Sequence, residues 1–332
     1  MSRILFIRLR LLGDIIFTLP SLQLFRAAFP KTRIYYLVEK TFRPIAEMLP
    51  PVDEVLDVPY RMGLSDLWQY RRRIRSLGFE QVVDFHSGPK SALLTFLTGA
   101  PVRVGYRTPN RNWAYTLRVS RKSSGLPLHS VENQGNLIRA LGIDRDRMPP
   151  YSRLRVPPSS FVEEVLEAPG ASAKKVVIHL GAKKRFRDWG EDHFFGLIDR
   201  FSRKGIRVFL IGNNREEQER GRRLAKKYPV TDLCGKISIP DLYCLVDRAD
   251  LYIGADSGPL HVATLTSTPA VALYGPNLPE ISGPYRRNGI TVIQKELPCR
   301  PCSQKNCMYD RIKCMDDITV EEVYEKSLEY LR

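Results

Sequence analysis

The stretch Ala249–Pro276, ADLYIGADSGPLHVATLTSTPAVALYGP, contains the pattern that decides the fold. Its apolar run 251–253 is typical of a buried strand, a second apolar segment of helical length begins near Gly258, and 269–274 is typical of another buried strand. The stretch therefore predicts a strand, a turn, a helix and a second strand. Units of this kind build parallel sheets with flanking helices.

The turn inside this unit favours an anionic ligand. Asp256, Ser257, Gly258 and Pro259 precede the helix, whose first N–H groups have no partner within the helix and lie at its positive end. Glycine lets a ligand approach the backbone closely, and proline suits a first helical turn. With His261 one turn further on, the pattern predicts a phosphate or diphosphate site. The alternative is an ordinary connection with a capping residue and a core histidine.

The length and composition predict a globular protein of two domains. The 332 residues exceed the usual size of a single core, and the apolar fraction of 43% is that of a folded protein. Arg3, Arg8, Arg10 and Asp14 interrupt the apolar runs near the N-terminus, and no later run approaches the roughly 20 uncharged residues that span a bilayer. We therefore expect a cytoplasmic protein, or one that is cytoplasmic and peripheral to a membrane.

The positive charge is concentrated in the first half of the chain. Residues 1–150 contain 23 Lys and Arg against 12 Asp and Glu, a net charge of +11, whereas residues 151–332 contain 29 against 24, a net charge of +5. Cations alternate with aromatic residues over 70–75 and 103–115. This pattern indicates an anionic partner, either a nucleic acid or an anionic lipid headgroup. Solvated helix and loop faces are the alternative.

The first half alternates short apolar runs with helical patterns, which predicts a doubly wound parallel sheet. The expected strands are 3–9, 34–38, 55–58 and 81–85, and the expected helices are 15–29, 41–49, 65–77, 88–98 and 130–141, with a turn at 12–14. Prolines 149, 150, 157, 158 and 169 then indicate a linker. The Asp-x-Asp pattern at 144–146 lies at its start and is interpreted as surface charge.

The second half repeats the same alternation. Strands are expected at 174–182 and 207–211, and helices at 191–204, 215–227, 239–247 and 319–331. The predicted organisation is a first domain 1–150, a linker 151–174, a second domain 175–318 and a C-terminal helix 319–332. A cleft between the two domains is the expected ligand site. The chain has no G-x-G-x-x-G and no G-x-x-x-x-G-K-[ST], which argues against an ordinary NAD site and a P-loop.

Three motifs resemble those of the ADP-heptose:lipopolysaccharide heptosyltransferases, glycosyltransferase family 9. They are RLRLLGD at 8–14 with TLP at 18–20, HLGA at 179–182 leading to RDW at 187–189, and DSGPLH at 256–261 with YGP at 274–276. The motifs follow the family's order over most of the chain. The resemblance implies a GT-B architecture, in which the first of two Rossmann-like domains binds the acceptor and the second binds an ADP-sugar.

The resemblance also implies roles for individual residues. Asp14 would be the general base that removes a proton from the acceptor hydroxyl. The alternative is that Asp14 is a simple helix cap. Arg10 and Gly13 would bind the acceptor. Glu217 or Glu219 would accept the ribose hydroxyls. The remaining donor-binding residues would be His179, Lys184, Arg187, Asp256, Ser257, Gly258 and His261. Reaction would invert the anomeric carbon, as expected of a single displacement with one base, and needs no catalytic metal.

Four of the six cysteines form a cluster before the final helix. Cys299, Cys302, Cys307 and Cys314 have the spacing C-x2-C-x4-C-x6-C. Four thiolates at short spacing suit tetrahedral zinc or an iron–sulfur cluster, and a cytoplasmic setting disfavours disulfides. A structural metal and four reduced thiols are the two interpretations.

Together these features predict an inverting GT-B glycosyltransferase that moves a heptose from ADP-heptose to the inner core of lipopolysaccharide, with an acceptor of the Kdo-lipid A type. We expect a monomer that works at the inner face of the cytoplasmic membrane and binds no nucleic acid. The alternatives are a GT-B transferase or epimerase that uses another nucleotide sugar and, in a different class, a basic nucleic-acid-binding protein.

Overall fold

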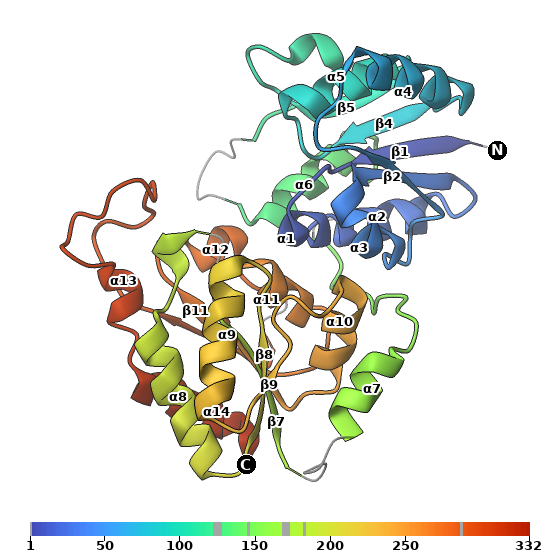
Figure 1. Ribbon diagram of the computed structural model, residues 1–332. Helices are drawn as coiled ribbons and strands as arrows, with labels where there is room; N and C mark the ends of the chain where they lie inside the picture. The colour runs from blue at the N-terminus through green and yellow to red at the C-terminus, as the bar shows by residue number, and fades with distance from the viewer. Residues whose placement is uncertain (1, 122–127, 145–146, 168–172, 182–183, 286–287) are drawn as a thin grey trace. The chain divides into compact units, whose positions relative to one another are not determined.

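The computed structural model describes residues 2–121, 128–144, 147–167, 173–181, 184–285 and 288–332. The chain divides into two compact units, Met1–Arg155 and Val156–Arg332 (Figure 1).

Unit 1 is built on a six-stranded parallel sheet with strand order β3-β2-β1-β4-β5-β6. The strands are β1 (Arg3–Ile7), β2 (Arg33–Glu39), β3 (Glu54–Val58), β4 (Gln81–Asp84), β5 (Val102–Tyr106) and β6 (Leu117–Val119). The helices are α1 (Leu12–Ile16), α2 (Leu19–Ala28), η1 (Lys40–Phe42), α3 (Arg43–Glu47), α4 (Leu64–Ser76), α5 (Pro89–Leu97), η2 (Asn112–Ala114) and α6 (Ser130–Arg139).

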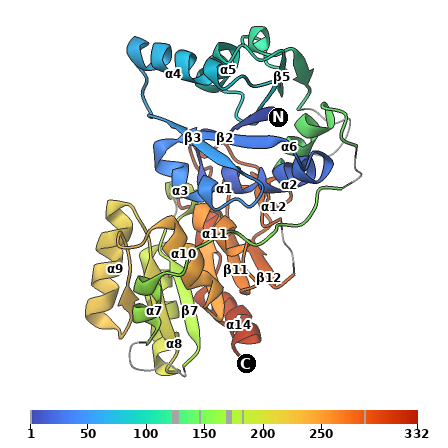
Figure 2. The same cartoon turned by 90° about the vertical axis from the view of Figure 1, so that its right-hand side faces the viewer.

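Helices cover both faces of this sheet. Helices α4 and α5 lie on one face, where Tyr70, Ile74 and Leu94 pack against side chains of β1 to β4. The other helices of the unit, α1, α2, α3 and α6, lie on the opposite face (Figure 2). The strands therefore have few exposed side chains, which explains why they are near-continuous apolar runs in the sequence.

Unit 2 repeats this architecture, with strand order β12-β11-β10-β7-β8-β9. Its strands are β7 (Lys175–His179), β8 (Arg207–Ile211), β9 (Thr231–Asp232), β10 (Leu251–Ala255), β11 (Ala270–Tyr274) and β12 (Ile290–Gln294). Its helices are α7 (Ser160–Glu167), η3 (Arg185–Arg187), α8 (Glu191–Arg203), α9 (Arg215–Lys227), α10 (Ile239–Asp247), α11 (Gly258–Ala263), α12 (Pro279–Ser282), α13 (Lys313–Asp316) and α14 (Val320–Leu331).

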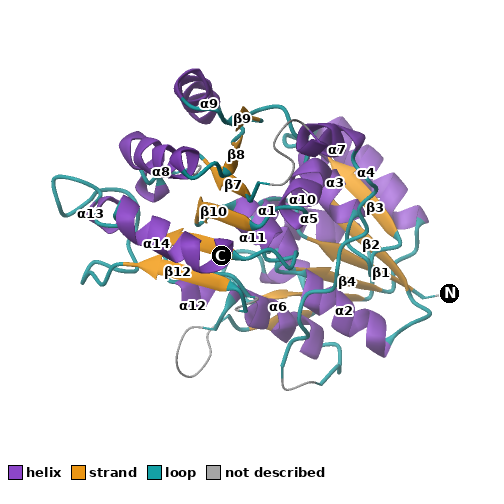
Figure 3. Cartoon of the chain, turned by 90° about the horizontal axis from the view of Figure 1, so that it is seen from below, coloured by secondary structure: helices purple, strands orange, loops and turns teal. Residues whose placement is uncertain are grey.

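One hydrophobic core joins the sheet of unit 2 to the helices α8, α9, α13 and α14. Phe194 and Phe201 of α8 and Val323 of α14 pack against the apolar side chains of β7, β8, β10 and β11. Helices α7, α10 and α11 lie on the other face of the sheet (Figures 1 and 3). The predicted α/β fold class, a doubly wound parallel sheet in each half, is confirmed.

The expected helix 15–29 and the turn before it are wrong in detail. Helix α1 already begins at Leu12, and the chain breaks near Thr18 before α2 begins. The Thr18 hydroxyl donates a hydrogen bond of 2.7 Å to the carbonyl of Ile15, and Pro20 lies at the start of α2. A carbonyl satisfied by a side chain and a proline that lacks an N–H both favour a new helix start at this point.

The expected linker 151–174 contains a helix. Helix α7 has Val162 and Leu166 buried, and Ser159 just before it donates a hydrogen bond of 2.6 Å to Asp241 of α10. The prolines on either side indicated a linker, so this short amphipathic helix was not predicted. Strands β5, β6, β9 and β12 were also missed, because they are short or partly exposed and give a weak apolar signal. Among the described residues, no helix is both long and apolar enough to span a bilayer.

Candidate functional site

The predicted donor residues of unit 2 lie at the carboxyl edge of its sheet. Strands β7, β8, β10 and β11 are parallel and adjacent, so the segments that follow them meet at one edge. His179 ends β7, Glu217 lies in the first turn of α9 after β8, and Ser257 follows β10. In open parallel sheets this edge is where ligands bind.

His179 connects the first and fourth strands of the unit. Its Nδ1 lies 3.1 Å from the hydroxyl of Ser257, and its Nε2 lies 3.9 Å from Oε1 of Glu217. Burial lowers the pKa of His179, although the negative charges of Glu217 and Asp188 act in the opposite direction and raise it. The imidazole is therefore neutral near pH 7, and it orders the Ser257 hydroxyl at the turn.

Glu217 is buried and caps the start of its own helix. Its Oε2 accepts hydrogen bonds of 2.6 Å and 3.1 Å from the amides of Asn213 and Asn214, while the Asn214 side chain accepts from the Glu217 amide at 2.8 Å. This reciprocal arrangement is a capping box. Glu219, the alternative in the sequence, pairs with Arg215 on the exposed face of α9, so Glu217 is the member of the pair at the sheet edge.

Arg187 and Asp256 form the charged centre of the edge. Arg187 Nη1 lies 3.3 Å from Asp256 Oδ2 and donates to the Asp256 carbonyl at 3.2 Å. Asp256 also accepts a hydrogen bond of 2.5 Å from Asn277, and Arg187 donates to Gln304 at 3.2 Å. The Tyr274 hydroxyl donates to the other oxygen, Asp256 Oδ1, at 3.4 Å, so both oxygens of this buried carboxylate are engaged. A carboxylate repels a phosphate, and the Arg187 guanidinium is therefore the group of this pair whose charge suits an anion.

The remaining predicted donor residues lie around this pair. Lys184 is exposed and directly precedes η3, and Gly258 begins α11. His261 is buried one turn into α11, with Nε2 3.9 Å from Asp256 Oδ1. The helix therefore starts with a glycine and a proline next to one guanidinium, a combination suited to an anion.

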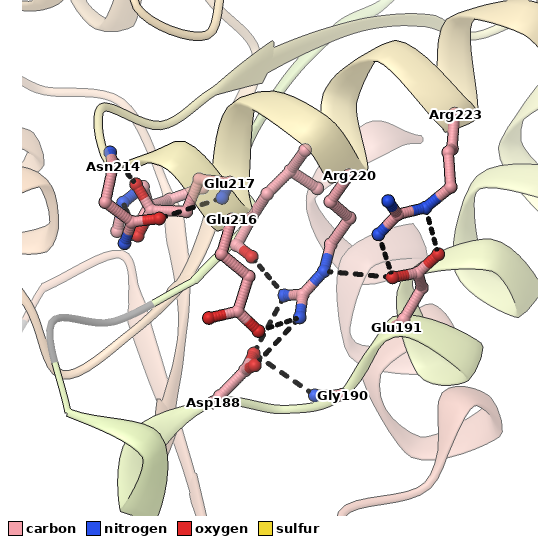
Figure 4. Close-up of polar contacts among 10 residues, drawn as sticks. Asp188, Gly190, Glu191, Asn214, Glu216, Glu217, Arg220 and Arg223 are labelled. Carbon is pink, nitrogen blue, oxygen red and sulfur yellow. Dashed lines mark hydrogen bonds and ion pairs between the residues drawn. The ribbon is translucent and has the colours of Figure 1, made fainter.

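Arg220 belongs to the same edge, although no sequence motif pointed to it. Its guanidinium is bidentate on Asp188, at 2.9 Å and 2.8 Å, and donates to the Leu180 carbonyl at 2.5 Å. Figure 4 shows Arg220 between Asp188 and Glu191, with Glu216 on the same helix nearby and Arg223 bound to Glu191 further out. Arg220 is 4% exposed and ties α9 to the segments before and after η3. Because helix α9 is rich in Arg and Glu, nothing in the sequence distinguishes Arg220 from its charged neighbours.

Asp14 lies at the equivalent carboxyl edge of unit 1. It is the third residue of α1, and its carboxylate forms an ion pair with Arg8, which follows β1. The N-cap residue of α1 is Leu11, and no side chain caps this helix. Leu11 has a φ of 70°, in the left-handed region that non-glycine residues rarely adopt. Asp14 is consequently not the helix cap.

The two predicted acceptor residues differ in exposure. Gly13 is buried in α1, whereas Arg10 is exposed and lies over the Tyr60 ring at 5.6 Å. Of these two residues, Arg10 can reach an acceptor with its side chain, whereas Gly13 would bind one through its backbone.

The four clustered cysteines share one cavity of about 220 Å³. Burial and the neighbouring Cys299, Cys307 and Cys302 raise the pKa of Cys314 to about 11. In the part of the chain that the structure describes, no three His, Cys, Asp or Glu side chains are grouped as ligands of a metal ion. The cysteines are thus gathered around one space without forming a closed coordination sphere.

Two Rossmann-like units, each with polar residues at the carboxyl edge of its sheet, are the architecture of GT-B proteins. The model of glycosyltransferase family 9 (heptosyltransferase) matches residues 67–313, and the chain belongs to this family. The resemblance inferred from the three motifs is thereby confirmed.

The chain is similar to curated heptosyltransferases over nearly its whole length. It is 26% identical to lipopolysaccharide heptosyltransferase 1 of Pseudomonas aeruginosa, over 92% of this chain and 88% of the relative. It is 25% identical to lipopolysaccharide heptosyltransferase 3 of Escherichia coli, over 91% of this chain and 92% of the relative.

Solved structures share the fold at lower sequence identity. The family 9 glycosyltransferase of Veillonella parvula has a TM-score of 0.87 at 22% identity and covers 99% of this chain and 97% of its own. The ADP-heptose lipopolysaccharide heptosyltransferase II of E. coli has a TM-score of 0.83 at 21% identity and covers 100% of this chain and 98% of its own. These structures show the fold. The family match and the curated relatives show that the chain is a glycosyltransferase enzyme of the heptosyltransferase type.

Proposed function

We propose that this enzyme transfers a heptose from ADP-heptose to the inner core of lipopolysaccharide, with inversion at the anomeric carbon. The observation that carries the proposal is the gathering of Arg187, Ser257 and Glu217 at one sheet edge of a family 9 enzyme. Two heptosyltransferases of lipopolysaccharide cover almost the whole chain, which supports the substrate class.

Unit 2 would bind the donor through groups of different chemistry. Arg187 and Lys184 would neutralise the diphosphate, and the amides at the start of α11 would donate to its oxygens. Glu217 would accept hydrogen bonds from the ribose hydroxyls through Oε1, since Oε2 is already engaged. These contacts would stabilise the departing ADP without a catalytic metal.

Unit 1 would bind the acceptor and supply the base. Asp14 would remove the proton of the acceptor hydroxyl as that oxygen attacks the anomeric carbon, while Arg8 holds the carboxylate in place. Arg10, Gly13 and the net charge of +11 over residues 1–150 would favour a phosphorylated or carboxylated acceptor. We further propose a monomer that works at the inner face of the cytoplasmic membrane and does not bind nucleic acid.

The test is incubation of the enzyme with a panel of nucleotide sugars and truncated Kdo-lipid A acceptors, scored by product mass. The proposal predicts a product heavier by one heptose, with ADP released only when the acceptor is present. Turnover with a different nucleotide sugar alone would reject ADP-heptose as the donor. Turnover of the nucleotide sugar without any acceptor would instead favour an epimerase.

A structural zinc ion or iron–sulfur cluster at Cys299, Cys302, Cys307 and Cys314 is a separate proposal. Four thiols around one cavity suit such a group in chemistry and number, and its binding would draw them together. Metal analysis of the purified protein should then find zinc or iron, and Cys302→Ser should lose it. Cys244→Ser, outside the cluster, should retain it. A metal-free wild-type protein with four titratable thiols would contradict the proposal.

A further inference from the structure

The loop before α13 passes beside the charged centre of the donor edge. This cysteine loop, residues 295–312, joins β12 to α13 and contains three of the four clustered cysteines. The cavity that the cysteines share is also lined by Phe186 and Pro276. Phe186 directly precedes Arg187 in the chain, and Pro276 directly precedes Asn277, the partner of Asp256. The cavity therefore lies against the two segments that form the charged centre.

Gln304 of the cysteine loop contacts this centre directly. Its Oε1 accepts a hydrogen bond of 3.2 Å from Arg187 Nε, and its Nε2 donates to Asn277 Oδ1 at 2.8 Å. Asn277 in turn donates to Asp256 Oδ2, the oxygen that lies 3.3 Å from Arg187 Nη1. The four side chains thus form a closed ring, in which each one is held by two others.

The ring leaves one nitrogen of the Arg187 guanidinium for a ligand. Nε and Nη1 are both engaged within the ring, whereas Nη2 has no partner among the residues that the structure describes. The Arg187 side chain is 23% exposed, so a ligand can reach it. Because the N–H groups of a guanidinium lie in one rigid plane, fixing two of its nitrogens also fixes the direction of the third. Gln304 therefore helps to set where Nη2 points.

Gln304 acts on Arg187 through geometry and leaves its charge in place. An amide oxygen accepts a hydrogen bond from a guanidinium without a formal charge of its own. A second carboxylate at this position would neutralise Arg187 further and would repel an anionic ligand. An uncharged acceptor is thus the group that orients this cation while keeping it attractive to a diphosphate.

Gln304 is itself held in place by the cysteine loop. Its amide donates to Cys302 Sγ at 3.2 Å, and the Cys302 amide donates to the Pro276 carbonyl at 3.1 Å. Gln304 has a φ of 57°, in the left-handed region that a non-glycine residue keeps only where its surroundings fix it. The placement of the Gln304 side chain therefore depends on the cysteines around it.

We propose that Gln304 is a positioning residue of the donor site, and that through it the state of the clustered cysteines sets the affinity for the diphosphate. The inference deepens the proposed function and rests on it for the identity of the donor. A free thiol, an oxidised sulfur or a metal-bound thiolate at Cys302 would each present a different acceptor to the Gln304 amide. A change at the cysteines would therefore alter the orientation of Arg187.

The first experiment is a calorimetric titration of the full chain with ADP. Gln304→Asn keeps an amide and suits a left-handed backbone, but its shorter side chain no longer reaches both Arg187 and Asn277. This variant should raise the Kd of ADP by roughly 5-fold. In an Arg187→Gln background the same change should have no further effect, because Gln304 acts through that guanidinium. Asn306→Ala, which alters an exposed amide of the same loop, is the matched control and should bind as the wild type does.

The second experiment tests the connection to the cysteines. Cys302→Ala removes the acceptor of the Gln304 amide, so it should also raise the Kd of ADP by roughly 5-fold. The double variant Cys302→Ala with Gln304→Asn should bind no more weakly than Gln304→Asn alone. Cys244→Ala, a cysteine outside the cluster, should leave the Kd unchanged.

Each result decides a separate point. Wild-type affinity in Gln304→Asn, or a further loss when this change is added to Arg187→Gln, overturns the positioning role. Losses from Cys302→Ala and Gln304→Asn that simply add overturn the connection to the cysteines. Wild-type affinity in Arg187→Gln would instead reject the proposed donor site. Failure of this inference alone would appear as a loss in Arg187→Gln with none in Gln304→Asn.

Discussion

Asp14 is the residue on which the proposed chemistry depends most. Replacement by Asn keeps the shape of the side chain and removes its ability to accept a proton, so Asp14→Asn should transfer heptose at least about 100-fold more slowly. Binding of ADP should be unchanged, since the proposed donor-binding residues lie in unit 2. Initial rates and equilibrium binding on the same preparation measure the two effects.

Asp66 provides the matched control for this variant. It is also the third residue of a helix in unit 1, and it accepts a hydrogen bond of 2.8 Å from the Gly63 amide. If Asp14 only stabilised its helix, both Asn variants would lose a little stability and keep their activity. Near-normal turnover by Asp14→Asn would remove this carboxylate from the mechanism.

Arg187 tests the donor site in the same way. Its guanidinium is fixed by Asp256 and Gln304, so Arg187→Gln should raise the Kd of ADP by roughly 10-fold or more. Arg185→Gln changes an exposed arginine two residues away and should have little effect. Calorimetric titration with ADP compares the two variants, and equal affinities would place the diphosphate elsewhere.

His86 predicts a pH dependence of stability. Burial and nearby cations lower its pKa to about 3 in the folded protein, from 6.5 in an unfolded chain, so unfolding takes up a proton between these values. The stability that a neutral His86 contributes is therefore present above pH 6.5 and is lost as the pH falls toward 3. His86→Gln should flatten the fall of the melting temperature over this range, measured by circular dichroism. His193→Gln, in helix α8, should retain the wild-type slope.

At the scale of elements, helix α9 is the one that most strongly organises the donor edge. Glu217 and Arg220 lie one turn apart on its buried face. A single helix therefore carries both the carboxylate proposed to bind the ribose hydroxyls and the guanidinium that holds Asp188. A helix with this many charged residues is held in place by specific pairs, because its apolar surface is small.

Arg220→Met should show what this helix contributes. The change leaves Asp188 and the Leu180 carbonyl without their donor, which should destabilise unit 2 by roughly 3 kcal/mol. Arg223→Met removes the exposed partner of Glu191 on the same helix and should change stability little. Urea unfolding followed by tryptophan fluorescence compares them, since Trp189 is buried in unit 2. Equal effects would mean that the buried contacts of Arg220 contribute no more to stability than the exposed ion pair of Arg223.

At the scale of the whole molecule, regular periodicity made much of the fold predictable. Strand β8 and helices α9 and α10 begin and end where the apolar pattern placed them. The break at Thr18 and helix α7 were missed, because one depends on a side-chain hydrogen bond and the other on packing against α10. Neither interaction is visible in a hydrophobic pattern.

The candidate site shows the same division. Asp256, Ser257 and Gly258 could be proposed from the sequence, because a glycine and a proline at a helix start are a local signal. Arg220 was missed, since REEQERGRR contains four arginines and the sequence does not indicate which of them is buried. The cations whose charges act on His86 were missed for a similar reason. Arg8, Lys90 and Arg121 come together only through the parallel pairing of β1 with β4, of β4 with β5 and of β5 with β6.

The proposed reaction is a single displacement, in which one base of unit 1 acts on an acceptor and the donor is held in unit 2. The most direct test is the mass and the anomeric configuration of the product that the wild-type enzyme forms from ADP-heptose and a Kdo-lipid A acceptor. The account predicts an acceptor heavier by one heptose, linked with inverted configuration. A product with retained configuration, or ADP-heptose left unchanged in the presence of acceptor, would contradict it.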